Sequence, residues 1–408
     1  MTISELLLRN ERAFLRLLTY RVQMSLAYQS MAVVVGWHLY ELTRDPWSLG
    51  LVGLAEVIPY FSTALFAGYA VDHYSRRLFG VLSAVVLFFN ALTLTAVSAG
   101  WLGGDPVWWI YGSIAVTGLA RAFIAPTYSS VFALILPRAQ FARASGVGTS
   151  VFQVGLVAGP ALGGILVGWT GTTAAYAVAT ALCLGAALAL WSLKLKEPPP
   201  VQGRPVFTSI AEGLRFVYGN QVILGAQLLD MFAVLFGGAV AMLPAFIHEV
   251  YRAGPEGLGI LRAAPAIGAV AVSLYLARHP VNRHAGRWLL SAVAGFGLCM
   301  IAFALTPHFW LAAFILLLSG LCDGISVVLR ATIVQLGTPD AMRGRVSAIN
   351  GIFIGSSNEL GAFESGLAAR LMGLVPSVIF GGMMTLGVVA ATAGLAPKLR
   401  RLELHQLH

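Results

Sequence analysis

Long runs of apolar residues, separated by short polar stretches, recur along the whole chain. The runs are about 20 residues or longer, which is the length an α-helix needs to cross the hydrocarbon core of a bilayer. We therefore predict twelve membrane-spanning helices in two sets of six. The first set covers residues 17–41, 49–71, 78–100, 107–136, 145–168 and 172–193, and the second covers 219–247, 257–277, 287–306, 309–336, 346–372 and 375–396.

A polar stretch at residues 194–215 separates the two sets. It contains the run Glu197–Pro200, and proline in series cannot continue a helix because it lacks the backbone N–H donor. The sequence thus predicts an N-terminal six-helix bundle over 1–193, a cytoplasmic linker over 194–215 and a C-terminal six-helix bundle over 216–408. The expected fold class is an all-α integral membrane protein.

Some residues recur at a constant offset of 202 positions, which indicates an internal repeat. Parallel repeats of this kind relate the two halves of a transporter by a pseudo-twofold axis along the membrane normal. The matching pairs are Pro137 and Pro339, Arg143 and Arg345, Ser145 and Ser347, and Gly118 and Gly320.

The composition supports the membrane assignment: 58% of the 408 residues are hydrophobic and only 11% are charged. The net charge of +9 does not indicate nucleic-acid binding, because the lysines and arginines gather at the termini and in alternate loops. The opposite loops hold only Arg44 and Arg252. This asymmetry follows the positive-inside rule and predicts a multi-pass protein of a bacterial-type plasma (inner) membrane with both termini cytoplasmic.

The stretch 68–77, GYAVDHYSRR, lies between the second and third apolar runs. Gly68 allows close packing of the helix end, Asp72 can pair with a cation, and Arg76 and Arg77 favour the cytoplasmic side. A loop that only fixes topology would explain the arginines but not Gly68 and Asp72. The spacing resembles the loop between the second and third helices of major facilitator superfamily transporters, and the resemblance implies a cytoplasmic gate.

The fifth apolar run carries small residues and a proline at a second recognisable spacing. Glycines three or four residues apart let two helix backbones approach, and a proline bends the helix. The pattern resembles the antiporter motif of exporters in the same superfamily; the alternative is a close-packed helix pair with no bearing on direction. Its members are Gly148, Gly155, Gly159, Pro160, Gly163 and Gly164.

The second half resembles one branch of that superfamily, which includes the enterobactin exporter and macrolide-efflux proteins. The resemblance rests on DMFAVLFGGAVAMLP at 230–244 and RGRVSAINGIFIGSSNELGAFESG at 343–366, and it covers essentially the whole chain. It implies secondary active export of amphipathic small molecules, of the drug or siderophore type. Proton antiport and alternating access are implied with it.

Charged residues inside apolar runs are costly unless they are paired or hydrated, so each is a functional candidate. The proton-coupling candidates are Asp230, Glu56 and Glu359, in that order, followed by Asp323 and Arg121. Asp323 and Arg121 occupy equivalent repeat positions, so they would face each other across the pseudo-twofold axis as a clamp or as the coupling device. Burial would favour the protonated form of Glu56, which could serve proton binding or a helix-to-helix hydrogen bond.

Polar and aromatic side chains within the runs are candidates for contact with cargo, although ordinary packing explains any one of the aromatics equally well. These substrate-cavity candidates are Gln29, Gln153, Asn350, Asn358, Phe232 and Phe353. No phosphate-binding loop, metalloprotease motif, nucleophile elbow or Cys/His metal spacing occurs in the sequence. We therefore expect no catalytic residue, no cofactor and no metal.

The sequence as a whole predicts a monomeric exporter that is not an enzyme, with a small-molecule substrate, protons and the lipid bilayer as its partners and no nucleic acid. Two alternatives stay open. One is a passive facilitator or a lipid or lysophospholipid flippase without proton coupling. The other is a non-transporting membrane sensor built on the same fold.

Overall fold

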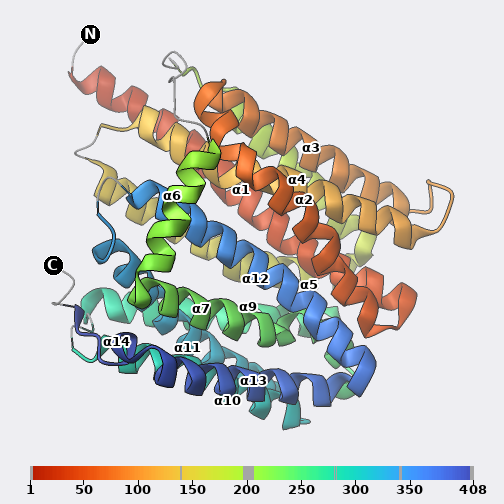
Figure 1. Cartoon of the computed structure of the whole chain (residues 1–408). Coiled ribbons are helices and arrows are strands. Elements are labelled where there is room, and N and C mark those ends of the chain that lie inside the picture. Colours follow the sequence, from red (N-terminus) through yellow and green to blue (C-terminus); the bar gives the residue numbers. More distant parts are fainter. Residues whose placement is uncertain are drawn as a thin grey trace. The chain divides into compact units, whose positions relative to one another are not determined.

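The computed structural model describes residues 3–137, 140–195, 206–279, 281, 283–339 and 342–404, and all regular elements in these ranges are helices (Figure 1). In the first half these are α1 (Ile3–Thr43), α2 (Pro46–His73), α3 (Arg76–Ser98), α4 (Pro106–Ile135) and α5 (Phe141–Trp191). In the second half they are α6 (Val206–Gly219), α7 (Gln221–Phe236), η2 (Gly238–Met242), α8 (Leu243–Phe246), η3 (Ile247–Tyr251), α9 (Pro255–Arg278), α10 (Ala285–Leu305), α11 (Phe309–Leu336), α12 (Arg343–Met372), α13 (Leu374–Leu395) and α14 (Pro397–Arg400).

Eight helical segments among the described residues are long and apolar enough to cross a membrane. The segment Ala144–Trp191 of α5 covers two of the predicted spans, and Gln221–Tyr251 joins α7 to η3 in one span. The helices α1, α2 and α12 are not among the eight. The chain is a multi-pass helical membrane protein, and the count of twelve spans stays a prediction.

Two tight turns occur at glycines that are 202 residues apart. Gly171 breaks α5 with φ 85° and ψ 171°, and Gly373 separates α12 from α13 with φ 93° and ψ 161°. Essentially only glycine adopts this backbone conformation, because a Cβ would clash with the main chain. The repeat inferred from the sequence therefore extends to the turns between helices.

Two sequence boundaries differ in detail from the helix ends, and the assignment of 194–215 as a linker stays a prediction. The predicted linker 194–215 becomes helical at Val206, where α6 begins, while its residues 196–205 lie outside the described ranges. The predicted loop after the second run is also shorter than expected. Asp72 belongs to the last turn of α2, and α3 begins at Arg76 because Ser75 caps it by accepting a hydrogen bond from the Leu78 N–H (3.3 Å).

Residue contacts divide the chain into two compact units. Unit 1 consists of Met1–Leu42, Ala55–Gly203 and Gly254–Gly259, and unit 2 consists of Thr43–Leu54, Arg204–Ala253 and Ile260–His408. Each unit is described by itself below.

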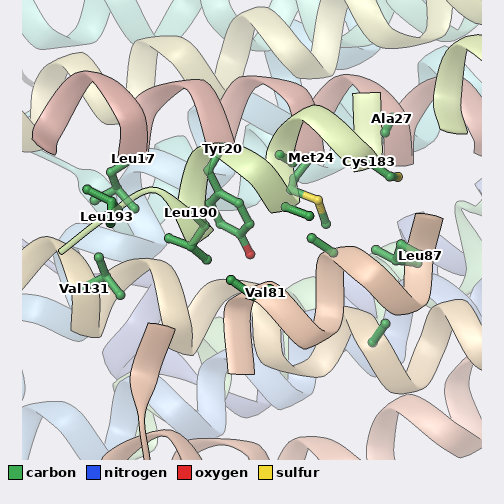
Figure 2. Close-up of a cluster of buried hydrophobic side chains, with 14 of the residues drawn as sticks. Leu17, Tyr20, Met24, Ala27, Val81, Leu87, Val131, Cys183, Leu190 and Leu193 are labelled. Atoms are coloured by element: carbon green, nitrogen blue, oxygen red, sulfur yellow. The ribbon is translucent and has the colours of Figure 1, made fainter. Parts of the chain in front are cut away.

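The core of unit 1 packs α1, α3, α4 and α5 around the fully buried side chain of Tyr20 (Figure 2). Leu17 and Met24 lie one turn on either side of Tyr20, and Leu190 of α5 closes the cluster. A polar network ties α3 to α4: the Asn90 amide donates to the Ser113 carbonyl (3.0 Å) and to the Thr117 hydroxyl (2.8 Å). Buried polar groups satisfied in this way hold two apolar helices in one register.

The main core of unit 2 is built from the corresponding helices of the second half. Ala226 and Leu229 of α7 pack with residues of α10, α11 and α14. These two residues lie 202 positions after Met24 and Ala27, which belong to the unit 1 core. The two first helices of the repeat therefore present the same faces to their cores.

Candidate functional site

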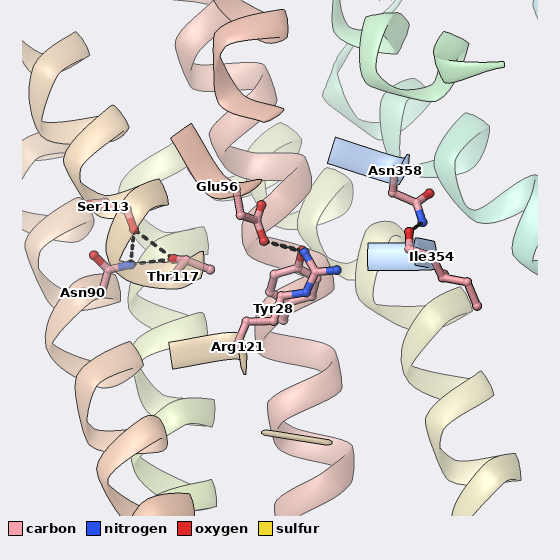
Figure 3. A network of polar contacts seen from close by, with 8 residues as sticks. All are labelled: Tyr28, Glu56, Asn90, Ser113, Thr117, Arg121, Ile354 and Asn358. Atoms are coloured by element: carbon pink, nitrogen blue, oxygen red, sulfur yellow. Dashed lines mark hydrogen bonds and ion pairs between the residues drawn. The ribbon is translucent and has the colours of Figure 1, made fainter. Parts of the chain in front are cut away.

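An ion pair lies inside unit 1, between α2 and α4 (Figure 3). A guanidinium nitrogen of Arg121 lies 2.6 Å from Oε1 of Glu56, whose side chain is 9% exposed. The Tyr28 hydroxyl, from α1, donates to the same carboxylate oxygen (3.0 Å) and accepts from Arg121 (2.8 Å). The rings of Tyr28 and Tyr60 lie 5.1 and 5.0 Å from the guanidinium carbon, so cation–π contacts add to the pair.

Gly118 allows the two helices of this pair to approach. A Cβ at Gly118 would lie 2.5 Å from the Glu56 carbonyl oxygen, so no larger residue fits between α4 and α2 here. In unit 2 the equivalent Gly320 of α11 packs in the same way against the Pro265 carbonyl of α9. The paired glycines of the repeat therefore serve the same close helix contact in both units.

A second ion pair lies in unit 2, between Asp230 of α7 and Arg330 of α11. Their side chains are only 9% and 5% exposed, respectively. Removing two charges from water costs several kcal/mol per ion, and the pair offsets that cost by mutual attraction. The pair therefore fixes the position of α7 against α11.

A small cavity of about 10 Å³ adjoins this pair, roughly the space that one water molecule needs. Asp230, Asp323 and Ser326 supply its polar lining, and Phe296 belongs to its apolar wall. Ser326 is 3% exposed, and its hydroxyl has no hydrogen-bond partner in the described part of the chain. Two carboxylates and one unsatisfied hydroxyl therefore line the cavity, and one guanidinium lies next to it.

The two units place different residue types at equivalent repeat positions. Tyr28 corresponds to Asp230, Arg121 to Asp323 and Tyr128 to Arg330, each at the offset of 202 residues. The pair of positions that holds Tyr28 and Arg121 in unit 1 therefore holds two carboxylates in unit 2. The compensating charge comes from Glu56 in unit 1 and from Arg330 in unit 2.

The structure gives Arg121 a partner other than the one the repeat suggested. Its carboxylate partner is Glu56 of the same unit, and the predicted facing of Arg121 and Asp323 stays a prediction. Glu56 itself is an ion-paired carboxylate rather than an isolated one in an apolar pocket. The spacing along the sequence did not reveal this pair, because the register of α2 against α4 depends on the packing at Gly118.

The exporter-helix motif lies on α5, and most of its glycines contact α1. Gly155 packs on Ser25, Gly159 on the Cβ of Gln29, and Gly163 on the Ser30 backbone, where a Cβ would lie 2.7 Å from the carbonyl oxygen. Gly148 lies against the Tyr128 hydroxyl. Gly164 packs on Gly259, and Pro160 lies inside the helix between these contacts. The predicted close approach of two helix backbones is therefore present.

The proposed gate residues lie at the end of α2 and the start of α3. Gly68 and Asp72 are in the last turns of α2, but their side chains are not described. Arg77 donates to the Leu193 carbonyl just after α5 (2.6 Å) and stacks over Trp191 at 5.7 Å. In unit 1 this arginine thus anchors the end of α5, and its role in a gate stays a prediction.

The substrate-cavity candidates have different surroundings. Asn358 of α12 is exposed and bonds to the Ile354 carbonyl of its own helix (2.8 Å; Figure 3). Phe353 packs against a small apolar cluster around Ile349, and Phe232 stacks on Phe236 at 6.5 Å. The remaining members, together with the coupling candidate Glu359, are partly buried: Gln29, Gln153, Asn350 and Glu359.

Sequence reasoning did not identify Tyr28, Arg330 and Ser326 as parts of these sites. Arg330 is a charge within an apolar run, and the repeat offset that leads to it from Tyr128 joins two different residue types. The described residues contain no group of three or more His, Cys, Asp or Glu side chains able to hold a metal ion. The main chemical feature of both sites is a buried ion pair.

The chain is similar in sequence to known proteins over most of its length. Residues 17–362 match the family model of the Major Facilitator Superfamily. The chain is 27% identical to the multidrug efflux pump Tap of Mycolicibacterium fortuitum over 392 residues, covering 91% of this chain and 92% of that protein. It is 25% identical to the enterobactin exporter EntS of Citrobacter koseri over 392 residues, covering 94% and 91% of the two chains.

Solved structures share the fold at low sequence identity. A D-xylose–proton symporter superposes with a TM-score of 0.73 at 13% identity, covering 96% of this chain and 99% of that one. A bacterial homologue of the human lysosomal transporter Spinster, in an inward-facing and unoccupied conformation, gives 0.72 at 16% identity, with 96% of each chain covered.

Proposed function

Because the chain belongs to the Major Facilitator Superfamily, and is therefore a membrane transporter and not an enzyme, we propose that it exports amphipathic small molecules of the drug or siderophore type by proton antiport. Similarity to a multidrug efflux pump and to an enterobactin exporter over more than nine-tenths of the chain supports this cargo class. The proposed mechanism is alternating access between two six-helix bundles, with both termini in the cytoplasm.

The observation that carries the proposal is the buried carboxylate beside an arginine in each unit. Glu56 pairs with Arg121, and Asp230 pairs with Arg330. A proton antiporter needs an acid that is protonated in one conformational state and ion-paired with a cation in the other. In these pairs, protonation of the carboxylate removes its attraction for the arginine, so proton binding and helix position are linked.

Asp230 is the first candidate for the coupling acid. It adjoins a cavity with a second carboxylate, Asp323, and loss of the Arg330 contact would leave the guanidinium free to move toward that neighbour. Glu56 is the second candidate and Glu359 the third. In this proposal Arg121 and Tyr28 hold Glu56 in place, and Asp72, Arg76 and Arg77 form the cytoplasmic gate.

The test uses purified protein in liposomes that contain a pH-sensitive dye, with enterobactin and ethidium as the added substrates. An antiporter moves protons against the substrate, so the internal pH changes when substrate is added. Asp230→Asn should abolish uphill export and still permit downhill exchange, because exchange needs no net proton movement. Glu249→Gln, a substitution of an acid in η3 away from the cavity, serves as the matched control.

Three outcomes contradict parts of the proposal. Substrate transport without any pH change would identify a passive facilitator or flippase. Binding of substrate without transport would identify a sensor on a transporter fold. Normal uphill export by Asp230→Asn, with unchanged pH dependence, would exclude this residue as the coupling acid and leave Glu56 as the next candidate.

A further inference from the structure

Arg21 of α1 lies between two aromatic rings of unit 1. Its guanidinium carbon is 3.8 Å from the centroid of the Tyr128 ring on α4 and 5.2 Å from the centroid of the Phe152 ring on α5. Cation–π contacts of this kind hold the plane of an arginine without consuming its hydrogen-bond donors. Three helices therefore fix the guanidinium in one orientation.

Among the residues that the structure describes, this guanidinium has no counter-ion. Within the described part of the chain no carboxylate pairs with Arg21, and its buried Nε has no hydrogen-bond partner. The buried Tyr128 hydroxyl lies beside it, within reach of the Arg21 side chain. Burying the Arg21 Nε–H without a partner costs free energy, which a hydrogen-bond acceptor on a bound molecule would recover.

The other interior arginines offer a direct comparison. Arg121 pairs with Glu56 and Arg330 pairs with Asp230. Arg330 occupies the repeat position equivalent to Tyr128, so both units carry an arginine at or beside this position. In unit 2 an acid of the chain, Asp230, neutralises this arginine. Among the described residues of unit 1 no acid pairs with Arg21, which leaves its charge available to an anion.

The surroundings of Arg21 suit an amphipathic molecule. Phe152 is 40% exposed, which leaves an aromatic face available beside the cation. Gly148 lies against the Tyr128 hydroxyl without a side chain of its own, so that end of the site is narrow and polar. Tyr128 follows Arg121 by seven residues on α4, two helical turns or about 10 Å along the axis. Arg21 therefore lies closer to the start of α1 than the Glu56–Arg121 pair does.

We propose that Arg21 and Tyr128 bind the acidic group of an aromatic or otherwise apolar cargo, whose apolar part packs on Phe152. The guanidinium fork and the phenol hydroxyl donate hydrogen bonds to a carboxylate, catecholate or sulfonate, which are oxygen acceptors that match the fork. This inference rests on the proposed export function and specifies its substrate class as anionic amphiphiles. With the N-terminus in the cytoplasm, Arg21 lies in the half of α1 that is nearer the cytoplasm, the compartment from which cargo is taken.

The test measures binding to purified full-length protein in neutral detergent, by isothermal titration calorimetry. The probes are 2-naphthoate and its uncharged isostere 2-naphthamide. Wild type should bind the naphthoate at least about tenfold more tightly than the amide, since a hydrogen bond to a charged group contributes roughly tenfold or more. Arg21→Gln should remove that preference, Arg21→Lys should retain part of it, and Tyr128→Phe should weaken naphthoate binding several-fold.

A matched control is Arg370→Gln, because Arg370 also stacks on an aromatic ring, Trp47 at 5.5 Å, but in unit 2. It should bind naphthoate as wild type does. Equal affinity of wild type for naphthoate and naphthamide, or an unchanged preference in Arg21→Gln, would overturn the inference. If Arg21→Gln fails to fold, the Arg21→Lys and Tyr128→Phe variants and the wild-type preference still decide.

A lipid headgroup shares the chemistry of an anionic cargo, so one arm of the experiment separates the two sources. Phosphatidylglycerol added at low mole fraction should leave naphthoate affinity unchanged, as should phosphatidylcholine. Competition by phosphatidylglycerol alone would identify a lipid as the occupant and overturn the cargo assignment. The measurement needs no membrane and no gradient, so its failure is distinct from failure of proton antiport.

Discussion

Asp230 and Arg330 form an ion pair in which both side chains are at least nine-tenths buried. The pair joins α7 to α11, and Asp323 of α11 lines the cavity beside it. Two carboxylates and one guanidinium therefore share one small region, with one negative charge in excess if both acids are ionised. In the proposed mechanism, protonation of Asp230 would release Arg330 toward Asp323.

The first prediction concerns the stability of this pair. Arg330→Gln should destabilise the protein by about 3–5 kcal/mol, because it leaves a buried carboxylate without a cation. Asp230→Asn with Arg330→Gln should recover a large part of that loss, since both charges are then absent. Thermal unfolding of the two variants and of wild type in detergent measures the difference. A double variant no more stable than Arg330→Gln would show that the pair contributes little.

The second prediction concerns the close contact of α5 with α1. Gly163→Ala should destabilise by roughly 1–3 kcal/mol and lower transport, because the new Cβ would lie 2.7 Å from the Ser30 carbonyl oxygen and overpack the helix pair. Gly146→Ala is the control on the same helix, since nothing lies within 4 Å of its added Cβ. Equal melting temperatures of the two variants would contradict the packing argument.

The third prediction concerns the proposed gate. Asp72→Asn should lower transport about tenfold while expression and substrate affinity stay close to wild type, since a charge-assisted hydrogen bond contributes roughly 1.5–3 kcal/mol. Rates in liposomes and binding in detergent separate the two quantities. A transport rate equal to wild type in this variant would show that the Gly68–Arg77 stretch serves only to set the topology.

The fourth prediction concerns orientation. In a background without Cys183, Cys299 and Cys322, Tyr74→Cys should resist an impermeant maleimide added to intact cells, and Gly103→Cys should react with it. Tyr74 is 66% exposed and a Cβ at Gly103 has nothing within 4 Å, so both positions are accessible by structure. Labelling at position 74 from outside would reverse the proposed topology.

The helices were predictable because apolar runs of membrane length are a strong local signal. The glycine-rich motif of α5 also correctly predicted a close helix pair, since the spacing of Gly155, Gly159 and Gly163 places them on one face. The start of α3 at Arg76 was not predicted, because the cap at Ser75 outweighs the charge of the arginines that follow it.

The charge pairs were not predictable as pairs. Glu56 and Asp230 were correctly singled out as buried acids, but the choice of partner depends on how helices are rotated against each other. The repeat suggested Arg121 with Asp323, whereas the contact at Gly118 places Glu56 next to Arg121. Arg21 shows the same limit: its two ring partners come from helices more than 100 residues away.

The turns at Gly171 and Gly373 have a practical consequence for handling this protein. Both glycines are exposed, but each turn reverses the chain at one residue and is too short to provide the flexible segment that a protease or an inserted epitope requires. Antibody fragments and fusion partners intended to aid structure determination should instead be directed at the longer connection between α3 and α4, around Gly100–Gly104, where the backbone is accessible.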